Sequence, residues 1–508
     1  MLVQHFLEES AKRCPWKVGL SCDGQRLTYG ELENCCNRLA HALRAQGLRR
    51  GERVVLYLPN SVELVIGIFA VLKAGGVSVA INYSTKIQKL AYILNNCQAS
   101  ALLTSHQRLS CAQRLVRQVP SLKTVVVSSL PPGGELANGF LSFDAIQEDY
   151  PAHGLAKVNI DLDLACLVYT SGSTGEPKGV MSDHSNVVFA TDSIIQYLQN
   201  VPSDIVVNVL PLSFDYGLYQ LFMVFRFGGT LVLEKGFSYP AAILKRIEQE
   251  RVTGFPGVPT IFARLQQMDV SRYDLSSLRY LTNTAAALPP SHIAKIRSMF
   301  PGVRFYSMYG LTETKRTLYL PPDELDRRPG SVGIPIPGTE AWLEDENGHR
   351  LGPGQTGELV VRGRHVMRGY WGHEEATRQR FRPGALPGER LCYTGDLFSM
   401  DQDGFFYFVA RSDDIIKSRG EKVAPKEVEN ILYSLHGVQE AAVVGVPDPL
   451  LGQAIKAFVV TEDADLTEVQ ILAHCRTQLE DFMVPKEVVL CKELPKTSSG
   501  KIDKRTLR

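Results

Sequence analysis

Short apolar runs alternate with stretches of helical spacing through the first part of the chain. Residues 53–58 and 77–81 are apolar runs, and residues 61–73 between them have the spacing of a helix. A strand, a helix and a second strand at this spacing predict a βα unit of a parallel sheet. Residues 29–46 are also predicted to form a helix, because Thr28 can cap its first turn.

The pattern changes several times along the chain. Residues 130–135 are rich in Pro and Gly, and a polar stretch follows to about residue 161, which we interpret as a connector between two subdomains. Strand–helix alternation then continues to about residue 320. Between residues 333 and 363, short strands alternate with Gly and Pro turns, which indicates a β-rich subdomain.

The pattern changes again after Arg411. The rest of the chain has one predicted helix and two predicted strands. We therefore predict an α/β fold with two domains. Residues 1–412 form a large domain of two βα-layered subdomains and a β-rich subdomain. Residues 413–508 form a small, mobile α+β domain.

The segment from Tyr169 to Gly179 carries the strongest chemical signal, with the sequence YTSGSTGEPKG after an apolar strand. Glycines allow close approach of the backbone to a phosphate, and hydroxyl and N–H groups can donate to its oxygens. Lys178 adds positive charge. The spacing differs from GxxxxGK[ST], so this is not a P-loop of that type. The alternative is a Gly/Ser linker, which the flanking strand and Pro-Lys-Gly disfavour.

Five further motifs follow in order. They are YGLTE at residues 309–313, GELVVRG at 357–363, YTGD at 393–396, RSDDIIKSRG at 411–420 and PKTSSGK at 495–501. With the first segment, they resemble the motifs of the AMP-forming adenylating enzymes, which include acyl-CoA synthetases, amino-acid adenylation domains and luciferases. The resemblance implies ATP-dependent activation of a carboxylic acid as its acyl-adenylate, with release of pyrophosphate.

The resemblance also assigns nucleotide-binding residues. Asp396 and Arg411 would bind the ribose, and Tyr309, with Gly310, would pack against adenine. A carboxylate can accept from both ribose hydroxyls. The β- and γ-phosphates would be held by Thr170, Ser171, Gly172, Ser173, Thr174, Gly175 and Lys178.

Four residues are assigned to catalysis by the same resemblance. Thr312 would contact the α-phosphate, and Glu313 would help to bind Mg²⁺, an ion that prefers carboxylate and phosphate oxygens. Lys501 would neutralise charge between the acid and the α-phosphate. The alternative for Lys501 is an ordinary residue of a basic tail. Asp413 would be the hinge about which the small domain rotates before thioester formation.

The acid pocket is less clearly defined. Asp215 follows Phe214, an arrangement that resembles amino-acid adenylation domains, in which this aspartate binds the substrate ammonium. The alternative is that Asp215 pairs with a cation of the protein, with Arg316 as the first candidate. The resemblance places further residues around the acid, several of them bulky, which favours a small substrate: Tyr216, Tyr219, Leu281, Asn283, Met308, Arg316 and Thr317.

Two acceptors remain open for the activated acyl group. Our main hypothesis is transfer of a small amino acid to the phosphopantetheine thiol of a separate carrier protein, as in nonribosomal peptide synthesis. The alternative is an acyl-CoA ligase for a non-amino carboxylic acid. A non-catalytic nucleotide-binding protein on the same fold is disfavoured, because the phosphate-binding segment, Glu313 and Lys501 are all present.

Composition and charge limit the partners and the cellular location that we expect. The formal net charge of +1 over 508 residues gives no indication of nucleic-acid binding. No apolar run is long enough to span a membrane, and no secretory signal is apparent. The ten cysteines lack metal-binding spacing. We expect a cytoplasmic monomer or homodimer with reduced thiols.

Overall fold

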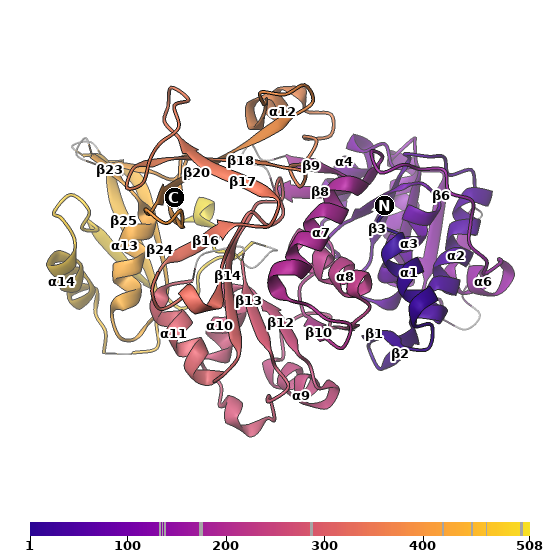
Figure 1. Cartoon of the computed structure of the whole chain (residues 1–508), viewed down its shortest axis with the longest axis horizontal. Coiled ribbons are helices and arrows are strands. Elements are labelled where there is room, and N and C mark those ends of the chain that lie inside the picture. The colour runs from indigo at the N-terminus through magenta and orange to yellow at the C-terminus, as the bar shows by residue number, and fades with distance from the viewer. Residues whose placement is uncertain are drawn as a thin grey trace.

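A computed structural model describes residues 1–131, 134, 136, 139–171, 176–284, 288–418, 421–448, 451–463, 465–497 and 501–507. These residues form a mixed α/β structure with three sheets, which confirms the predicted fold class. In Figure 1 the N-terminal part lies on the right, and the C-terminal part, with α13 (Pro425–Ser434), lies on the left.

The first sheet belongs to the N-terminal subdomain and has the strand order β7-β6-β5-β3-β4-β8-β9 within the described residues. Every neighbouring pair is parallel except the last, which is the antiparallel hairpin β8–β9. The strands are β3 (Arg53–Tyr57), β4 (Val77–Ala80), β5 (Ala101–Ser105), β6 (Thr124–Ser128), β7 (Phe140–Ser142), β8 (Leu164–Ser171) and β9 (Pro177–Asp183).

Helices cover both faces of this sheet. Along β3, Val54 and Leu56 pack in one apolar cluster and Val55 and Tyr57 in another, as the alternation of side chains along a strand requires. The helices of this subdomain are α1 (His5–Arg13), α2 (Tyr29–Ala45), α3 (Val62–Lys73), α4 (Ile87–Asn96), α5 (Leu109–Gln118) and α6 (Phe143–Asp149), with a short 3-10 turn η1 (His106–Arg108).

Local predictions for this subdomain are largely confirmed. Thr28 caps α2, and Glu31 completes the capping box by accepting from the Thr28 backbone.

The interpretation of the stretch up to residue 161 as a connector is wrong in part. It contains α6 and also β7, which pairs with β6. Most residues of α6 are polar, so the sequence gave little indication of a helix. Its two buried residues, Phe143 and Ile146, pack against the core.

The second sheet joins a parallel half to an antiparallel half. Its order is β17-β18-β20-β21-β16-β15-β14-β13-β12-β10-β11-β1-β2, with β19 beside β20. The parallel half is the second βα subdomain, with an antiparallel edge strand β2. Its strands are β1 (Val18–Cys22), β2 (Gln25–Thr28), β10 (Ile205–Asn208), β11 (Thr230–Leu233), β12 (Gly254–Gly257), β13 (Tyr280–Asn283) and β14 (Arg304–Tyr309).

The antiparallel half is the predicted β-rich subdomain. Its strands are β15 (Leu318–Leu320), β16 (Ser331–Pro335), β17 (Thr339–Glu344), β18 (Thr356–Gly363), β19 (Phe381–Pro383), β20 (Arg390–Met400) and β21 (Phe406–Arg411). The helices and turns of this part of the chain are α7 (His184–Leu198), α8 (Asp215–Phe227), α9 (Pro240–Glu250), α10 (Pro259–Leu265), η2 (Val270–Arg272), α11 (Pro290–Met299), η3 (Pro322–Glu324) and α12 (Glu374–Arg380).

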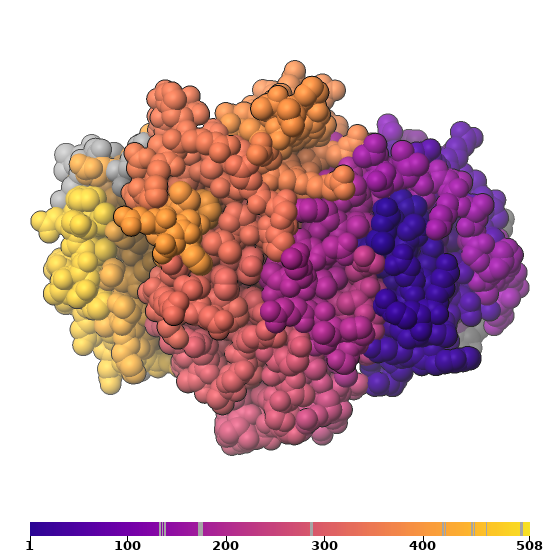
Figure 2. Space-filling model, in the orientation of Figure 1, coloured from indigo at the N-terminus to yellow at the C-terminus, as the bar shows by residue number. Residues whose placement is uncertain are grey.

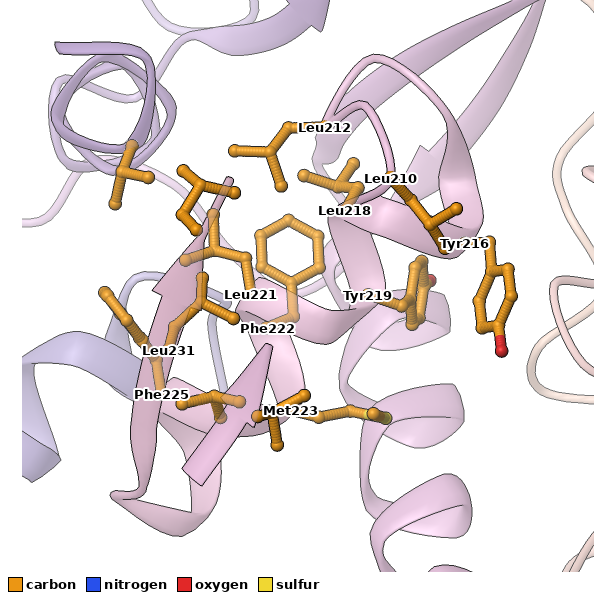
Figure 3. Packing of buried hydrophobic residues seen from close by; sticks show 14 of the residues in the cluster. Leu210, Leu212, Tyr216, Leu218, Tyr219, Leu221, Phe222, Met223, Phe225 and Leu231 are labelled. Carbon is orange, nitrogen blue, oxygen red and sulfur yellow. The ribbon is translucent and has the colours of Figure 1, made fainter. Parts of the chain in front are cut away.

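Helix α8 joins the two βα subdomains. It is buried on nearly every side, which is typical of a helix in the centre of a large core. Phe225 of α8 stacks on Phe69 of α3, with ring centroids 5.2 Å apart. In Figure 3 the apolar residues of α8 meet Leu231 of β11 on one side, whereas Tyr216 and Tyr219 lie at the opposite edge of the cluster. Tyr216 and Tyr219 are buried too, so this edge of α8 belongs to the same core.

The small domain has its own sheet and its own core. The strand order is β23-β22-β25-β24, with β26 beside β25. Its apolar cluster is separate from those of the large domain. The elements are β22 (Ile416–Ser418), β23 (Glu421–Val423), β24 (Val438–Asp448), β25 (Gly452–Thr461), α14 (Glu468–Gln478), β26 (Glu487–Cys491) and η4 (Lys504–Thr506), in addition to α13.

The small domain contacts the large one in this structure, and Figure 2 shows its yellow surface against the red and orange part of the chain. His292 of α11 meets Tyr433 of α13 edge to face, with ring centroids 5.2 Å apart. Gln267 donates to Glu462 at 2.9 Å. The predicted boundary at residue 412 and the hinge at Asp413 stay predictions. None of the helices in the described part of the chain is long and apolar enough to cross a membrane.

Replacing Lys73 with alanine is expected to destabilise the N-terminal subdomain. The Lys73 ammonium is buried and contacts Glu33 at 2.7 Å and Glu8 at 3.1 Å, so it ties α3 to α2 and α1. Its loss leaves Glu33 without its cation and Glu8 with only the exposed Lys157 at 3.6 Å, which costs about 3 kcal/mol. Chemical denaturation measures this cost.

The matched control is Lys235→Ala. Lys235 pairs with Asp23 at 2.7 Å, but both side chains are exposed, so the expected loss is under about 1 kcal/mol. Equal losses in the two variants would contradict the assignment of Lys73 as a buried anchor.

Candidate active site

The phosphate-binding segment lies at the tip of the β8–β9 hairpin. Thr170 of β8 and Lys178 of β9 are cross-strand partners. The Lys178 ammonium lies 5.6 Å from the ring centroid of Tyr370, within reach of a cation–π interaction. For Ser171 the structure describes the backbone, and four predicted residues lie outside the described part: Gly172, Ser173, Thr174 and Gly175. The structure therefore brings Thr170 and Lys178 together at the base of the predicted phosphate site.

Tyr309 at the end of β14 and Asp396 in the middle of β20, both predicted to bind the nucleotide, contact each other. Tyr309 donates its hydroxyl to Asp396 Oδ2 at 2.6 Å. Arg411, the cross-strand partner of Asp396, places Nε 3.4 Å from Oδ1. Burial raises the pKa of Asp396, and Arg411 and Tyr309 oppose that rise. Oδ1 has no hydrogen bond among the described residues, so one oxygen of this buried carboxylate can accept from a ligand.

Glu313 is held by groups that the sequence did not single out. Tyr370 donates its hydroxyl to Glu313 Oε1 at 2.6 Å. Arg380 donates to the carbonyl of Tyr393 at 2.9 Å, and Glu313 raises its pKa against the effect of burial. Because Tyr370 contacts Oε1, Oε2 is the oxygen suited to a metal ion. Neither Tyr370 nor Arg380 belongs to a segment with a chemical pattern, so sequence reasoning had no signal for them.

Lys501 lies among the acidic residues of the large domain. Desolvation of its ammonium by surrounding protein atoms lowers the pKa of Lys501 most, although the residue as a whole is exposed. Asp215, Asp396 and Glu313 lie close enough to raise that pKa, and Arg411 lowers it. Asp215 and residues of three motifs far apart in the sequence therefore act on the charge of one lysine. The catalytic role of Lys501 stays a prediction.

Three of the predicted acid-pocket residues lie on parallel strands, and ligands of α/β sheets bind at the carboxyl ends of such strands. Leu281 and Asn283 lie on β13, and Met308 lies near the end of β14. All three are buried, and Tyr197 donates its hydroxyl to Met308 Sδ at 2.9 Å. The hydroxyl of Thr317 contacts that of Thr314 at 2.7 Å, which stabilises the loop between β14 and β15.

Asp215 begins α8 and has a partner within the protein. Arg316 Nη1 lies 3.9 Å from Asp215 Oδ2, and both side chains are buried. The Arg316 guanidinium also lies over the ring of Tyr216, 4.3 Å from its centroid. Tyr216 contacts Thr282 through its hydroxyl at 2.6 Å. This is the alternative that the sequence left open for Asp215, so the carboxylate does not require a substrate ammonium.

The predicted hinge segment contacts the strand that carries Asp396. Arg411 Nε lies 3.2 Å from Asp413 Oδ1, and Ser412 donates its N–H to the carbonyl of Gly395 at 2.9 Å. The residue that carries the predicted ribose contact is thus two positions from the predicted hinge. Rotation at Asp413 would change the surroundings of Arg411 directly.

The fold and this site define an adenylate-forming ligase, and comparison with known proteins gives the family. The family model described as AMP-binding enzyme matches residues 7–371, and the model of the AMP-binding enzyme C-terminal domain matches residues 427–501. The chain belongs to the AMP-binding enzyme family. It is therefore an enzyme of the AMP-forming class that activates a carboxylic acid with ATP, as the six motifs predicted.

Several relatives match over nearly their whole length. The chain is 35% identical to feruloyl-CoA synthase of Amycolatopsis sp, covering 98% of this chain and 96% of the relative. It is 33% identical to a long-chain-fatty-acid–CoA ligase of Bacillus subtilis, covering 99% and 94%. Gramicidin S synthase 2 of Brevibacillus brevis is 29% identical over 99% of this chain, which is 11% of that protein.

Solved structures are also similar to this chain over nearly its whole length. The anthranilate CoA ligase AuaEII in complex with anthranoyl-AMP is similar with a TM-score of 0.92 and 30% identity, covering 100% of this chain and 96% of that one. MatB from Rhodopseudomonas palustris is similar with a TM-score of 0.90 in its ATP-bound structure and 0.81 in its apo structure, at 28% identity and with 100% and 98% coverage in each.

Proposed function

We propose that this enzyme makes an acyl-adenylate and transfers its acyl group to the thiol of coenzyme A. The observation that supports the proposal is the buried Asp396 carboxylate held by Tyr309 and Arg411, and Asp396 also raises the pKa of Lys501. In the proposed reaction the Lys501 cation would neutralise charge as a substrate carboxylate and the α-phosphate, both anionic, meet. The full-length similarity to feruloyl-CoA synthase and a fatty-acid–CoA ligase supports CoA as the acceptor.

In the first step, a carboxylate oxygen of the acid attacks the α-phosphorus, and the bond from that phosphorus to pyrophosphate breaks. Lys178 and Thr170 would hold the departing phosphates at the hairpin tip. Asp396 would accept from a ribose hydroxyl through Oδ1. Lys501 would neutralise the negative charge that builds up between the two substrates, which is the main catalytic need in phosphoryl chemistry.

Mg²⁺ fits this site through Glu313. Magnesium is commonly held by one or two carboxylates together with substrate phosphates, and the Tyr370 hydrogen bond fixes the Glu313 carboxylate for such a contact. When bound, the ion would neutralise phosphate charge. The substrate phosphates would supply further ligands of the ion.

In the second step, the thiolate sulfur attacks the acyl carbonyl carbon and AMP leaves. We expect the small domain to rotate about Asp413, which withdraws Lys501 and admits the thiol. The ten cysteines are free, and the use of ATP and CoA fits a cytoplasmic enzyme.

The test measures both half-reactions with the purified full-length protein. Pyrophosphate release is followed across amino acids and aliphatic, aromatic and dicarboxylic acids. Each active acid is then offered CoA or a phosphopantetheinylated carrier protein, and the thioester is identified by mass spectrometry. We expect acyl-CoA from a non-amino acid. Exclusive loading of an amino acid onto the carrier would overturn the proposal and favour the carrier-protein hypothesis.

A further inference from the structure

A short segment between β18 and α12 lies along the edge of the first sheet. Met181 of β9 donates its N–H to the carbonyl of Gly369 at 2.9 Å. Trp371 donates its N–H to the carbonyl of Gly179, also on β9, at 2.8 Å. Residues 367–371, which we call the edge segment, therefore run beside the strand that carries the predicted phosphate-binding lysine.

The edge segment also contacts Glu313, the residue proposed to bind Mg²⁺. Met367 donates its N–H to the carbonyl of Glu313 at 2.9 Å. Tyr370 donates its hydroxyl to Glu313 Oε1 at 2.6 Å, the length of a charge-assisted hydrogen bond. One bond fixes the backbone of Glu313, and the other fixes the direction of its carboxylate.

Tyr370 is itself held from several sides. It is 7% exposed, and its ring packs edge to face against Phe381 with centroids 5.7 Å apart. Its N–H donates to the Thr377 hydroxyl at 2.9 Å. The Lys178 ammonium lies 5.6 Å from the centroid of the same ring. Tyr370 thus contacts the predicted metal-binding residue through its hydroxyl and lies beside a predicted phosphate-binding residue through its ring.

The edge segment and β8 share an anchor in the N-terminal subdomain. Asn96, the last residue of α4, accepts from the Trp371 indole N–H at 3.1 Å and from the Tyr169 hydroxyl at 2.6 Å. Tyr169 directly precedes Thr170 of the predicted phosphate site. The Arg53 guanidinium lies 4.7 Å from the ring centroid of Trp371. The segment that positions Glu313 is therefore attached to the same part of the protein as the β8–β9 hairpin.

This attachment has a consequence for metal binding. A Mg²⁺ ion bound with a nucleotide contacts protein carboxylate and substrate phosphates together. Glu313 must therefore be placed correctly with respect to the β8–β9 hairpin. Residues that orient a metal-binding side chain commonly change metal affinity by about ten- to a hundredfold when they are replaced.

We propose that Tyr370 is a positioning residue that fixes the Glu313 carboxylate relative to the β8–β9 hairpin, so that Mg²⁺ and the ATP phosphates are bound as one unit. This inference rests on the proposed binding of Mg²⁺ through Glu313. Tyr370 acts through Glu313: its hydroxyl occupies Oε1 and directs Oε2 to the ion.

The first test is Tyr370→Phe, which removes the hydroxyl but keeps the ring beside Lys178. Calorimetry measures the dissociation constant of an ATP analogue with a methylene group between its α- and β-phosphates, once with saturating Mg²⁺ and once with EDTA. We expect binding to weaken about tenfold or more with Mg²⁺ and less than about twofold with EDTA. The analogue cannot release pyrophosphate, so this measurement is independent of activity.

The second test is a double-mutant cycle with Glu313→Gln. We expect Glu313→Gln to weaken binding of the Mg²⁺ complex by itself. Tyr370→Phe should add nothing further in that variant, because the carboxylate that it orients is already gone. The matched control is Tyr407→Phe. Tyr407 also donates to a carboxylate, that of Asp401, at 3.1 Å, and its replacement should leave both dissociation constants unchanged.

The outcomes separate this inference from its premise. If Glu313→Gln weakens the Mg²⁺ complex and Tyr370→Phe does not, the positioning role is disproved and binding of Mg²⁺ through Glu313 stands. Equal weakening with Mg²⁺ and with EDTA in Tyr370→Phe, or additive losses in the double variant, would show a general structural role and overturn the inference. If Glu313→Gln has no effect, the inference fails together with its premise. Formation of acyl-CoA is measured separately and decides the acceptor in every case.

Discussion

Lys501→Ala is expected to lower the rate of adenylate formation by about a thousandfold while the protein stays folded. The ammonium is the group on which Asp215, Asp396 and Glu313 converge, so its loss leaves the meeting of carboxylate and phosphate without a neutralising charge. Thioester formation from a pre-made acyl-adenylate should survive, because that step uses the rotated small domain. Pyrophosphate release and acyl-CoA formation from added adenylate measure the two steps separately.

Lys504→Ala is the matched control for this prediction. Lys504 lies on the same terminal segment but pairs with Glu429 of the small domain at 2.6 Å. Its replacement should leave adenylation within a few-fold of wild type. Similar losses in the two variants would indicate a basic tail of general importance. Equal loss of both half-reactions in Lys501→Ala would mean that the enzyme does not use two conformations.

Asp413→Pro is expected to preserve adenylation and to lower thioester transfer by on the order of a hundredfold. Proline fixes φ near −65°, so it removes the rotation that a hinge residue needs. In the proposed reaction, adenylation uses the conformation in which Asp396 and Glu313 act on Lys501, so it does not depend on that rotation. Single-turnover transfer from enzyme-bound adenylate to CoA measures the loss.

Asp413→Ala separates the hinge from the ion pair. It removes the carboxylate that lies 3.2 Å from Arg411 but keeps a freely rotating backbone. Transfer should therefore remain close to wild type in this variant. Transfer that is unchanged in Asp413→Pro would place the hinge at another residue. Loss in both variants would assign the effect to the contact with Arg411.

The nucleotide half of the site could be predicted because its chemistry is local. A phosphate site needs glycines, hydroxyls and a lysine within one turn of chain, and the segment that contains Thr170 and Lys178 shows them in order. Thr312 and Glu313 stand together in a second run, and Asp396 in a third. The sequence does not show which side chains hold these groups in position. The hydrogen bond from Tyr370 to Glu313 is an example. Tyr370 lies 57 positions away along the chain.

The βα layers were predictable for the same reason. Strand β3 and helix α3 carry unbroken apolar periodicity, and capping residues mark where α2 and α3 begin. Helix α6 was not predicted because only two of its residues are buried. These residues pack against parts of the core that are far away in the sequence. A short helix gains its stability from tertiary packing rather than from its own sequence.

By itself, the sequence determined that this protein has the nucleotide chemistry of an adenylating enzyme, since each motif is a contiguous run with its own physical requirement. Only the tertiary structure decided the surroundings of the acid. Asp215 and Arg316 lie on different elements, and their pairing across 3.9 Å cannot be read from spacing along the chain. Charge balance is a property of distances in space, and those distances are set by packing.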